Sequence, residues 1–279
     1  MKDIWLIYNP RSKSSDEALV AALEQTFADA NRPISRKLKV GEDDLPDVQT
    51  VRAAGVELVI VLSGDGTINA AAQALDGWDG VLLVLPGGTM NLLARALHDD
   101  RTAPEIAQAF LSGEGAASPI PVINGEGLTA YAGVIAGPSS AWADVREDMR
   151  NLDLVAAGAN AAKAVTATFN EPCVGLDGHE GEYPAIYLEP RDDHLQAFGV
   201  RAETAVDLIS HGWAWLQGDF REGPSDSLPA DQQVTLTSAA PTLGLLVDGE
   251  KAQGESPATF RLGRSNLRFF SARGGIKWS

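Results

Sequence analysis

The chain has 279 residues, of which 44 % are hydrophobic and 22 % charged, and its formal net charge is −16. This composition is that of a globular protein with one large or two ordinary domains. The negative charge argues against binding nucleic acid by neutralising phosphates, and against docking on an anionic bilayer through a broad basic patch.

Cysteine content and hydropathy bear on the compartment. The single Cys173 cannot form an internal disulfide, which fits a reducing compartment. The apolar run over residues 4–8 is too short for a signal-peptide core, and no stretch approaches the roughly 18 apolar residues of a membrane helix. We therefore expect a cytoplasmic protein that contacts a membrane only peripherally.

The first part of the chain repeats one pattern, in which a short apolar strand is followed by a turn-rich loop and a helix. Strands are predicted at residues 4–8, 56–62 and 81–85, with helices at residues 16–30, 68–75 and 92–97. Continuous apolar strands that alternate with helices predict a parallel sheet covered on both faces. The three loops would then lie at the carboxyl edge of the sheet, where such folds bind ligands.

The pattern changes near residue 118, and a second, mostly antiparallel domain is expected after it. Strands are predicted at residues 130–136, 185–189, 233–237, 243–247, 258–262 and 267–271, with helices at residues 141–156 and 204–216. The sequence thus predicts an α/β domain over residues 1–118 and a β-sandwich-like domain over residues 119–279.

The most informative loop is Ser63-Gly64-Asp65-Gly66-Thr67, which follows the second strand. Its two glycines allow a tight turn and close backbone approach, and Thr67 could cap the helix that follows. Backbone N–H groups at a helix start suit a phosphate. Asp65 would repel a phosphate, so its natural roles are to bind Mg²⁺ or to orient a hydroxyl. A plain strand-to-helix turn is the alternative.

Two other loops share this design. Residues 86–91, Pro-Gly-Gly-Thr-Met-Asn, place the short polar side chains of Thr89 and Asn91 at a helix start, where they bind a ligand or simply cap the helix. In the loop at residues 9–12, Arg11 could reach a phosphate or remain solvated. The chain has neither a Walker A sequence nor a Gly-x-Gly-x-x-Gly fingerprint, and its four histidines lack zinc-ligand spacing.

Together these loops resemble the diacylglycerol kinase catalytic-domain family, which includes bacterial soluble lipid kinases, sphingosine kinases and ceramide kinases. The Asn-Pro loop, the Gly-Asp-Gly-Thr turn and Pro-Gly-Gly-Thr-x-Asn occur in the order and spacing of that family, and residues 247–250, Val-Asp-Gly-Glu, are similar to its late Asp-Gly-Glu motif. The resemblance implies an ATP-dependent kinase that phosphorylates a lipid hydroxyl, with diacylglycerol as the expected acceptor and an active site between the two domains.

The resemblance also implies roles for individual residues. The residues that would surround ATP are Asn9, Pro10, Arg11, Ser12, Ser63, Gly64, Asp65, Gly66, Thr67, Gly88, Thr89 and Asn91. Asp65 would help to hold Mg²⁺, and Glu250 would take the proton from the lipid hydroxyl. Without the resemblance, the Asp-Gly pair before Glu250 predicts a hairpin turn. A structural magnesium site of the family would fall at Asp193, although His194 replaces the glycine usual there.

Two other functions stay open. NAD kinases and phosphofructokinases carry a similar Gly-Gly-Asp-Gly-Thr turn, so the acceptor could be a soluble molecule. Departures from the family at Lys13, Leu92 and His194 would fit a non-catalytic nucleotide or lipid sensor. The expected partners are ATP and a lipid, with transient membrane contact and no nucleic acid. The sequence predicts neither the lipid species nor the oligomeric state.

Overall fold

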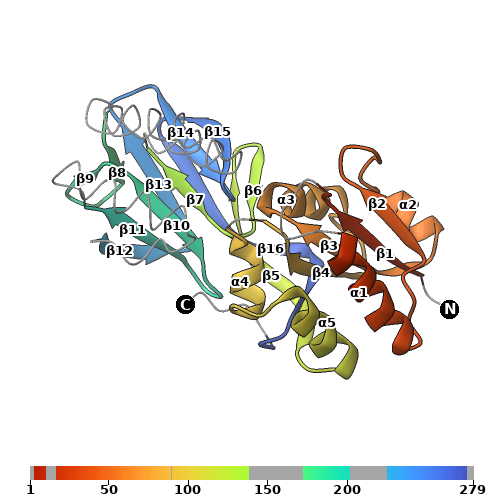
Figure 1. Ribbon diagram of the computed structural model, residues 1–279. Coiled ribbons are helices and arrows are strands. Elements are labelled where there is room, and N and C mark those ends of the chain that lie inside the picture. Colours follow the sequence, from red (N-terminus) through yellow and green to blue (C-terminus); the bar gives the residue numbers. More distant parts are fainter. Residues whose placement is uncertain (1–2, 11–16, 89, 138–171, 202–224, 275–279) are drawn as a thin grey trace, which may run out of the picture. The chain divides into compact units, whose positions relative to one another are not determined.

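A computed structural model describes residues 3–10, 17–88, 90–137, 172–201 and 225–274. The expected helices at residues 141–156 and 204–216 lie outside these residues, as do Arg11, Ser12 and Thr89. The chain forms two compact units (Figure 1). The first comprises Met1–Ile120 and Arg264–Ser279, and the second comprises Pro121–Gly263.

The first unit is built on a parallel sheet in the strand order β2-β1-β3-β4. Its strands are β1 (Asp3–Tyr8), β2 (Arg36–Lys39), β3 (Val56–Ser63) and β4 (Val81–Pro86). Its helices are α1 (Glu17–Asp29), α2 (Val48–Ala53), α3 (Asp65–Ala74), α4 (Leu92–His98) and α5 (Ala103–Ser112). The three predicted repeats of strand, loop and helix are thus confirmed.

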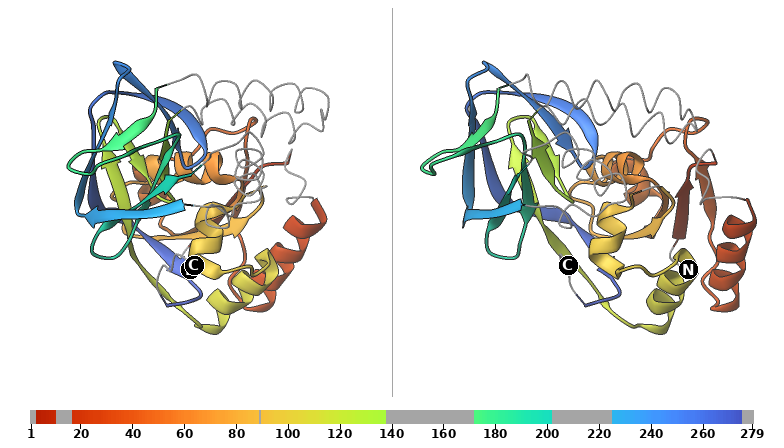
Figure 2. Two further views of the ribbon diagram at one scale, coloured as in Figure 1. Left: turned by 90° about the vertical axis from the view of Figure 1, so that its left-hand side faces the viewer. Right: turned by 60° about the vertical axis from the view of Figure 1, so that its left-hand side comes forward.

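Both faces of this parallel sheet are buried, as its continuous apolar strands predict. Even-numbered residues of β1 and β3, such as Leu6 and Ile60, form one core cluster with α1 and α5. Odd-numbered residues such as Ile7 and Val59 are also fully buried, and successive strand side chains point to opposite faces. Figures 1 and 2 show the helices of this unit on both sides of the sheet, and Figure 2 gives the clearest view of α1 and α5 together.

The last strand returns to the first unit, which includes residues 264–279. The predicted division at residue 118 had assigned these residues to the second domain. The two strands expected at residues 258–262 and 267–271 are one 14-residue strand, β16 (Ala258–Ser271). Its end pairs in parallel with β4, where Phe269 lies opposite Leu82. Leu267 and Phe269 are fully buried, whereas Arg268 between them is exposed. Burial of this apolar alternation completes the core of the first unit.

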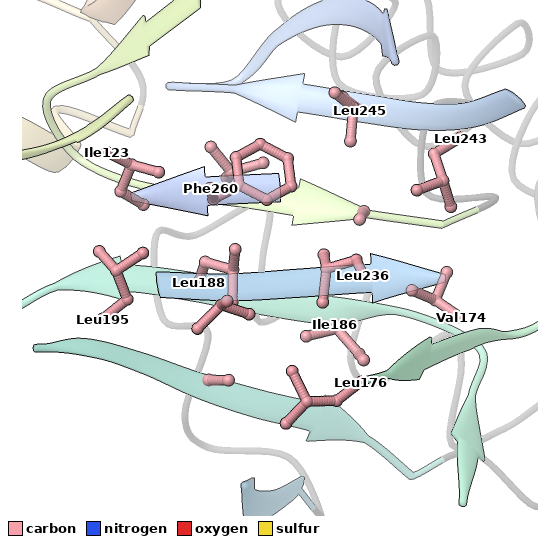
Figure 3. Close-up of a cluster of buried hydrophobic side chains, with 14 of the residues drawn as sticks. Ile123, Val174, Leu176, Ile186, Leu188, Leu195, Leu236, Leu243, Leu245 and Phe260 are labelled. Atoms are coloured by element: carbon pink, nitrogen blue, oxygen red, sulfur yellow. The ribbon is translucent and has the colours of Figure 1, made fainter. Parts of the chain in front are cut away.

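The second unit is antiparallel, as predicted. Its strands are the end of β5 (Ala116–Gly125), then β6 (Leu128–Ala130), β7 (Val134–Ala136), β8 (Val174–Leu176), β9 (Glu182–Tyr183), β10 (Ile186–Pro190), β11 (Leu195–Val200), β12 (Ser225–Asp231), β13 (Gln233–Ser238), β14 (Thr242–Val247), β15 (Glu250–Glu255) and the start of β16. One sheet has the order β12-β11-β10-β7-β14-β15, while β13 pairs with both β16 and β8. Figure 3 shows Leu188, Leu236 and Phe260 among the side chains that fill the core.

One predicted strand of the second unit is interrupted. The strand expected at residues 130–136 is divided into β6 and β7, because Tyr131, Ala132 and Gly133 donate their N–H groups to a side chain instead of a neighbouring strand. In the part of the chain that the structure describes, no helix has the length and apolar character needed to cross a membrane.

Candidate active site

The described residues of the three loops identified in the sequence lie side by side at the carboxyl edge of the parallel sheet. Tyr8 at the end of β1 is paired with Leu62 of β3, and Ser63 is paired with Pro86 at the end of β4. The N–H of Asn9 donates to the carbonyl of Leu62 at 3.3 Å. Parallel pairing therefore brings together loops that are up to about eighty residues apart in the chain.

The second and third loops touch through their backbones. A Cβ atom on Gly88 would lie 2.5 Å from the Cα of Gly64, whereas a Cβ on Gly64 would lie 3.5 Å from the Cα of Gly88. The N–H of Gly87 also donates to the carbonyl of Ser63 at 3.0 Å. No side chain fits at position 88 without displacement of the loops, so glycine is needed there for close approach.

Asp65 is the first residue of α3 and is buried. The helix begins three residues earlier than predicted, with Gly64 as its N-cap in an extended conformation. The carbonyl of Gly64 accepts the N–H groups of Thr67 and Ile68, each at 3.1 Å. Thr67 is therefore a residue of the first turn, and its predicted capping role is wrong. A carboxylate in the first turn interacts favourably with the positive end of the helix dipole.

Ser63 and Asn91 are two further polar residues of these loops. The hydroxyl of Ser63 is fully buried, and the described residues provide no hydrogen-bond partner for it. Asn91 adopts a left-handed conformation with φ of 52°, and its amide accepts from the N–H of Gly88 at 2.7 Å and donates to the carbonyl of Gly88 at 3.1 Å. Asn91 thus holds its own loop in shape, and contact of its side chain with ATP stays a prediction.

The late Asp-Gly-Glu motif forms the predicted hairpin turn. Asp248 and Gly249 have φ values of 50° and 85° and join β14 to β15, in which Val247 pairs with Glu250. Positive φ at both turn residues is typical of a type I′ turn. The side chain of Glu250 is exposed, so a ligand can reach its carboxylate.

Asp248 has a role that the sequence did not indicate. Its side chain is 3 % exposed, and its carboxylate accepts the N–H groups of Tyr131, Ala132 and Gly133 at 2.9, 2.7 and 3.0 Å. These partners lie more than a hundred residues earlier in the chain. Only the pairing of β7 with β14 brings them into reach, and no local sequence signal announces it.

Asp193, the expected magnesium ligand, lies exposed between β10 and β11. One of its oxygens is 2.7 Å from Nδ1 of His194, the residue that replaces the glycine of the family. Within the described ranges, no group of three or more His, Cys, Asp or Glu side chains could hold a metal ion. A metal at Asp193 stays a prediction.

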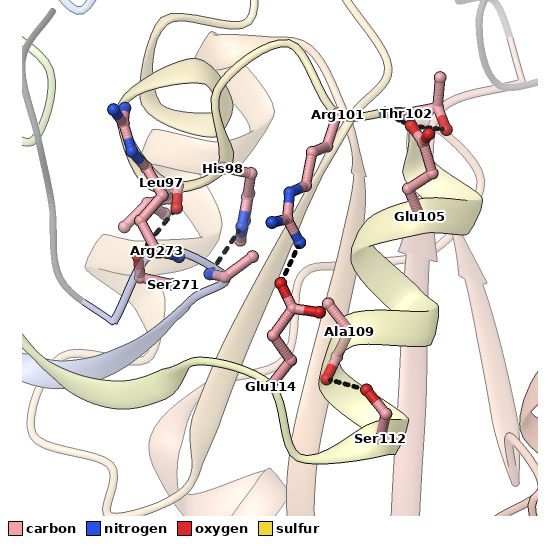
Figure 4. Close-up of polar contacts among 11 residues, drawn as sticks. Leu97, His98, Arg101, Thr102, Glu105, Ala109, Ser112, Glu114, Ser271 and Arg273 are labelled. Carbon is pink, nitrogen blue, oxygen red and sulfur yellow. Dashed lines mark hydrogen bonds and ion pairs between the residues drawn. The ribbon is translucent and has the colours of Figure 1, made fainter.

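His98 at the end of α4, which Figure 4 shows with its neighbours, was assigned no function from the sequence. Its side chain is fully buried. Its Nδ1 accepts the N–H of Ala272 at 3.3 Å, and the hydroxyl of Ser271 donates to the carbonyl of Leu97 at 2.8 Å. Burial lowers the pKa of His98 to about 4. The Val84 carbonyl raises this pKa by a smaller amount, and the Arg101 guanidinium lowers it further. These contacts attach the end of β16 to α4.

Residues 3–122 match the family model of the diacylglycerol kinase catalytic domain. This part of the chain, 120 of the 279 residues, is similar to that domain. The match contains all three loops at the carboxyl edge of the sheet, and it ends close to the boundary of the first unit at Ile120. No curated protein matches the sequence.

Solved structures share the fold over nearly the whole chain. A proposed diacylglycerol kinase from Bacillus anthracis strain Sterne has a TM-score of 0.65 at 17 % identity, covering 97 % of this chain and 96 % of that one. Two further structures from the same organism, one described as a diacylglycerol kinase and one as a proposed one, have TM-scores of 0.62 and 0.63 at 16 % identity and cover 97 % of both chains. At these identities the likeness shows the fold alone.

Proposed function

We propose that this protein is an ATP-dependent lipid kinase that transfers the γ-phosphoryl group of ATP to a lipid hydroxyl. Diacylglycerol is the acceptor that we expect. The proposal is supported by the family match over residues 3–122 and, above all, by the position of Asp65. This buried carboxylate starts a helix beside the contact between Gly64 and Gly88. In the proposal the first unit binds ATP and the second binds the lipid.

The phosphates of ATP bind at the N-terminus of α3 in this proposal. The first N–H groups of a helix lack intrahelical partners, and the helix dipole favours negative charge there. The Gly64–Gly88 contact keeps Cβ atoms away from this backbone. The buried Ser63 hydroxyl, which has no partner among the described residues, suits a phosphate oxygen or a bridging water. By contrast, the N–H of Gly88 is already engaged by Asn91.

Asp65 holds Mg²⁺ in this proposal. Mg²⁺ in nucleotide sites is commonly bound by one or two carboxylates together with substrate phosphates and water. One buried carboxylate at the carboxyl edge therefore fits the ion, and no cluster of acidic side chains is required. When bound, the ion would neutralise negative charge on the phosphates. The protein's own contribution is to keep the Asp65 carboxylate in place through the helix start and the capping Gly64.

Glu250 is the proposed general base. The oxygen of the lipid hydroxyl attacks the γ-phosphorus, the bond from this phosphorus to the β–γ bridging oxygen breaks, and ADP leaves with the electron pair. The hydroxyl proton passes to the carboxylate of Glu250, a role that typically contributes about 10²–10⁴-fold to the rate. The exposure of Glu250 supports this assignment, because a base must be within hydrogen-bond reach of its substrate.

The test is an acceptor screen with γ-labelled ATP and Mg²⁺. Diacylglycerol, sphingosine and ceramide are dispersed in detergent, and NAD and fructose 6-phosphate serve as soluble acceptors. We expect label in a lipid, and incorporation at least about 10²-fold slower with the Asp65→Asn variant. Label only in a soluble acceptor would instead assign a soluble-substrate kinase, and ATP binding without transfer would assign a sensor. Sedimentation with lipid vesicles then tests the transient membrane contact that a lipid acceptor requires.

A further inference from the structure

The turn before Glu250 is attached to a distant segment by four hydrogen bonds. One carboxylate oxygen of Asp248 accepts from Ala132 and Gly133 at 2.7 and 3.0 Å, and the other accepts from Tyr131 at 2.9 Å. The N–H of Asp248 donates to the carbonyl of Gly133 at 3.0 Å. We refer to this set of contacts as the Asp248 anchor.

A hairpin turn by itself does not require this arrangement. Type I′ turns need residues that tolerate positive φ, and asparagine or glycine would satisfy that need at position 248. Burying a carboxylate is unfavourable unless hydrogen bonds compensate for the lost water. The three backbone donors supply that compensation. The carboxylate of Asp248 therefore serves the attachment of the turn and not its local conformation.

The segment that receives the carboxylate is itself held firmly. A Cβ on Gly133 would lie 2.5 Å from the ring of Tyr187 and 2.9 Å from the carbonyl of Leu188, so β10 packs directly against this backbone. Immediately after it, Val134 pairs with Val247 of β14. The turn is thus fixed from two sides, by strand pairing and by the Asp248 anchor. Glu250 directly follows the turn, as the first residue of β15.

We propose that Asp248 is a positioning residue for phosphoryl transfer, in that the Asp248 anchor sets the place of the Glu250 carboxylate. This inference rests on the proposed function of Glu250 as the base. Asp248 is poorly suited to be the base itself, because it is buried and both of its carboxylate oxygens accept N–H groups. A misplacement of about 1 Å in a reacting group can cost about 10²-fold in rate.

Two substitutions separate the carboxylate from the turn conformation. Asp248→Asn keeps positive φ and one acceptor oxygen, while Asp248→Gly keeps positive φ and removes every acceptor. A matched control is Asn31→Gly, since Asn31 also has positive φ, 56°, but is exposed in the turn that follows α1. Transfer from γ-labelled ATP to diacylglycerol in detergent micelles is measured across pH, together with amide hydrogen exchange of residues 131–133.

We expect kcat to fall by about 10–10²-fold in Asp248→Gly and by less in Asp248→Asn, with the KM for ATP unchanged. The acidic limb of the pH profile should persist in both variants and disappear only in Glu250→Gln. Amide exchange of residues 131–133 should rise by about tenfold or more in Asp248→Gly. Asn31→Gly should match the wild type in every measurement.

Each remaining outcome overturns a defined part of the inference. Wild-type kcat in Asp248→Gly, with faster exchange at residues 131–133, would show an anchor that positions nothing. Loss of the acidic limb in Asp248→Asn would make Asp248 the base. Unchanged exchange in Asp248→Gly would disprove the anchor itself. Absence of transfer by the wild type to any acceptor would overturn the proposed function, and the exchange result would still decide whether the anchor exists.

Discussion

Gly88 lies so close to Gly64 that a Cβ on Gly88 would come within 2.5 Å of the Cα of Gly64, whereas the reverse distance is 3.5 Å. The two loops, which the sequence indicated separately, therefore pack against each other through their backbones. The asymmetry of the two distances makes the contact testable, because the same methyl group should be tolerated at one position and not at the other.

Gly88→Ala should destabilise the protein by about 1–3 kcal/mol, the usual cost of overpacking. Gly64→Ala is the matched control and should cost less than about 1 kcal/mol, since its added methyl group would be in ordinary van der Waals contact. Denaturant unfolding monitored by circular dichroism measures both values. Equal losses for the two variants would contradict the packing that we describe.

Asp65→Asn should lower kcat/KM for lipid phosphorylation by at least about 10²-fold, the order of effect for one preorganised electrostatic group. The substitution nearly preserves shape while removing the charge that would hold Mg²⁺. Stability should change by no more than about 1 kcal/mol, because the size and shape of the side chain are kept and the favourable interaction with the helix dipole is worth about that much or less. Near-normal activity in a folded variant would leave Asp65 with a structural role only, at the start of α3.

His98 should make the first unit sensitive to acid. Its pKa is about 4 in the folded protein, against about 6.5 in an unfolded chain. Between these pH values the unfolded state binds more protons than the folded state. The contribution of His98 to the free energy of unfolding is therefore complete above about pH 6.5 and is lost as the pH falls toward 4. A pKa difference of this size corresponds to about 3 kcal/mol.

The His98→Gln variant should flatten this acid limb of the stability curve when unfolding is followed at several pH values. Ser271→Ala is the control, because it removes the nearby hydrogen bond to Leu97 without removing a titrating group. That variant should be less stable at every pH and keep the wild-type slope. A His98→Gln curve parallel to the wild type would assign the acid sensitivity to other groups.

A fragment of residues 1–120 should not fold, because it lacks the strand that pairs with β4 and buries Phe269 and Phe270. A chain joining residues 1–120 to residues 264–279 through a short linker should fold, since Ile120 already donates its N–H to the Ser265 hydroxyl at 2.9 Å. Amide exchange and circular dichroism distinguish the two cases. A stably folded fragment of residues 1–120 would show that β16 is dispensable.

Local patterns in the sequence were sufficient for the elements whose cause is local. Continuous apolar runs identified β1, β3 and β4, since strands buried on both faces need apolar residues at every position. Loops rich in glycine and short polar residues identified the carboxyl edge of the sheet. The Asp-Gly pair at positions 248 and 249 identified a hairpin turn, because positive φ is demanded by the turn itself.

The tertiary structure alone decided which distant groups meet. Apolar alternation in β16 predicts a strand that buries one face, but periodicity does not say which core receives it, and Phe269 enters the first unit. In the same way, sequence alone predicts that an aspartate in a turn is exposed to solvent. The tertiary structure shows instead that the N–H groups of residues 131–133 donate to the carboxylate of Asp248. Buried polar groups need partners, and partners separated by more than a hundred residues are selected by strand pairing and packing across the fold.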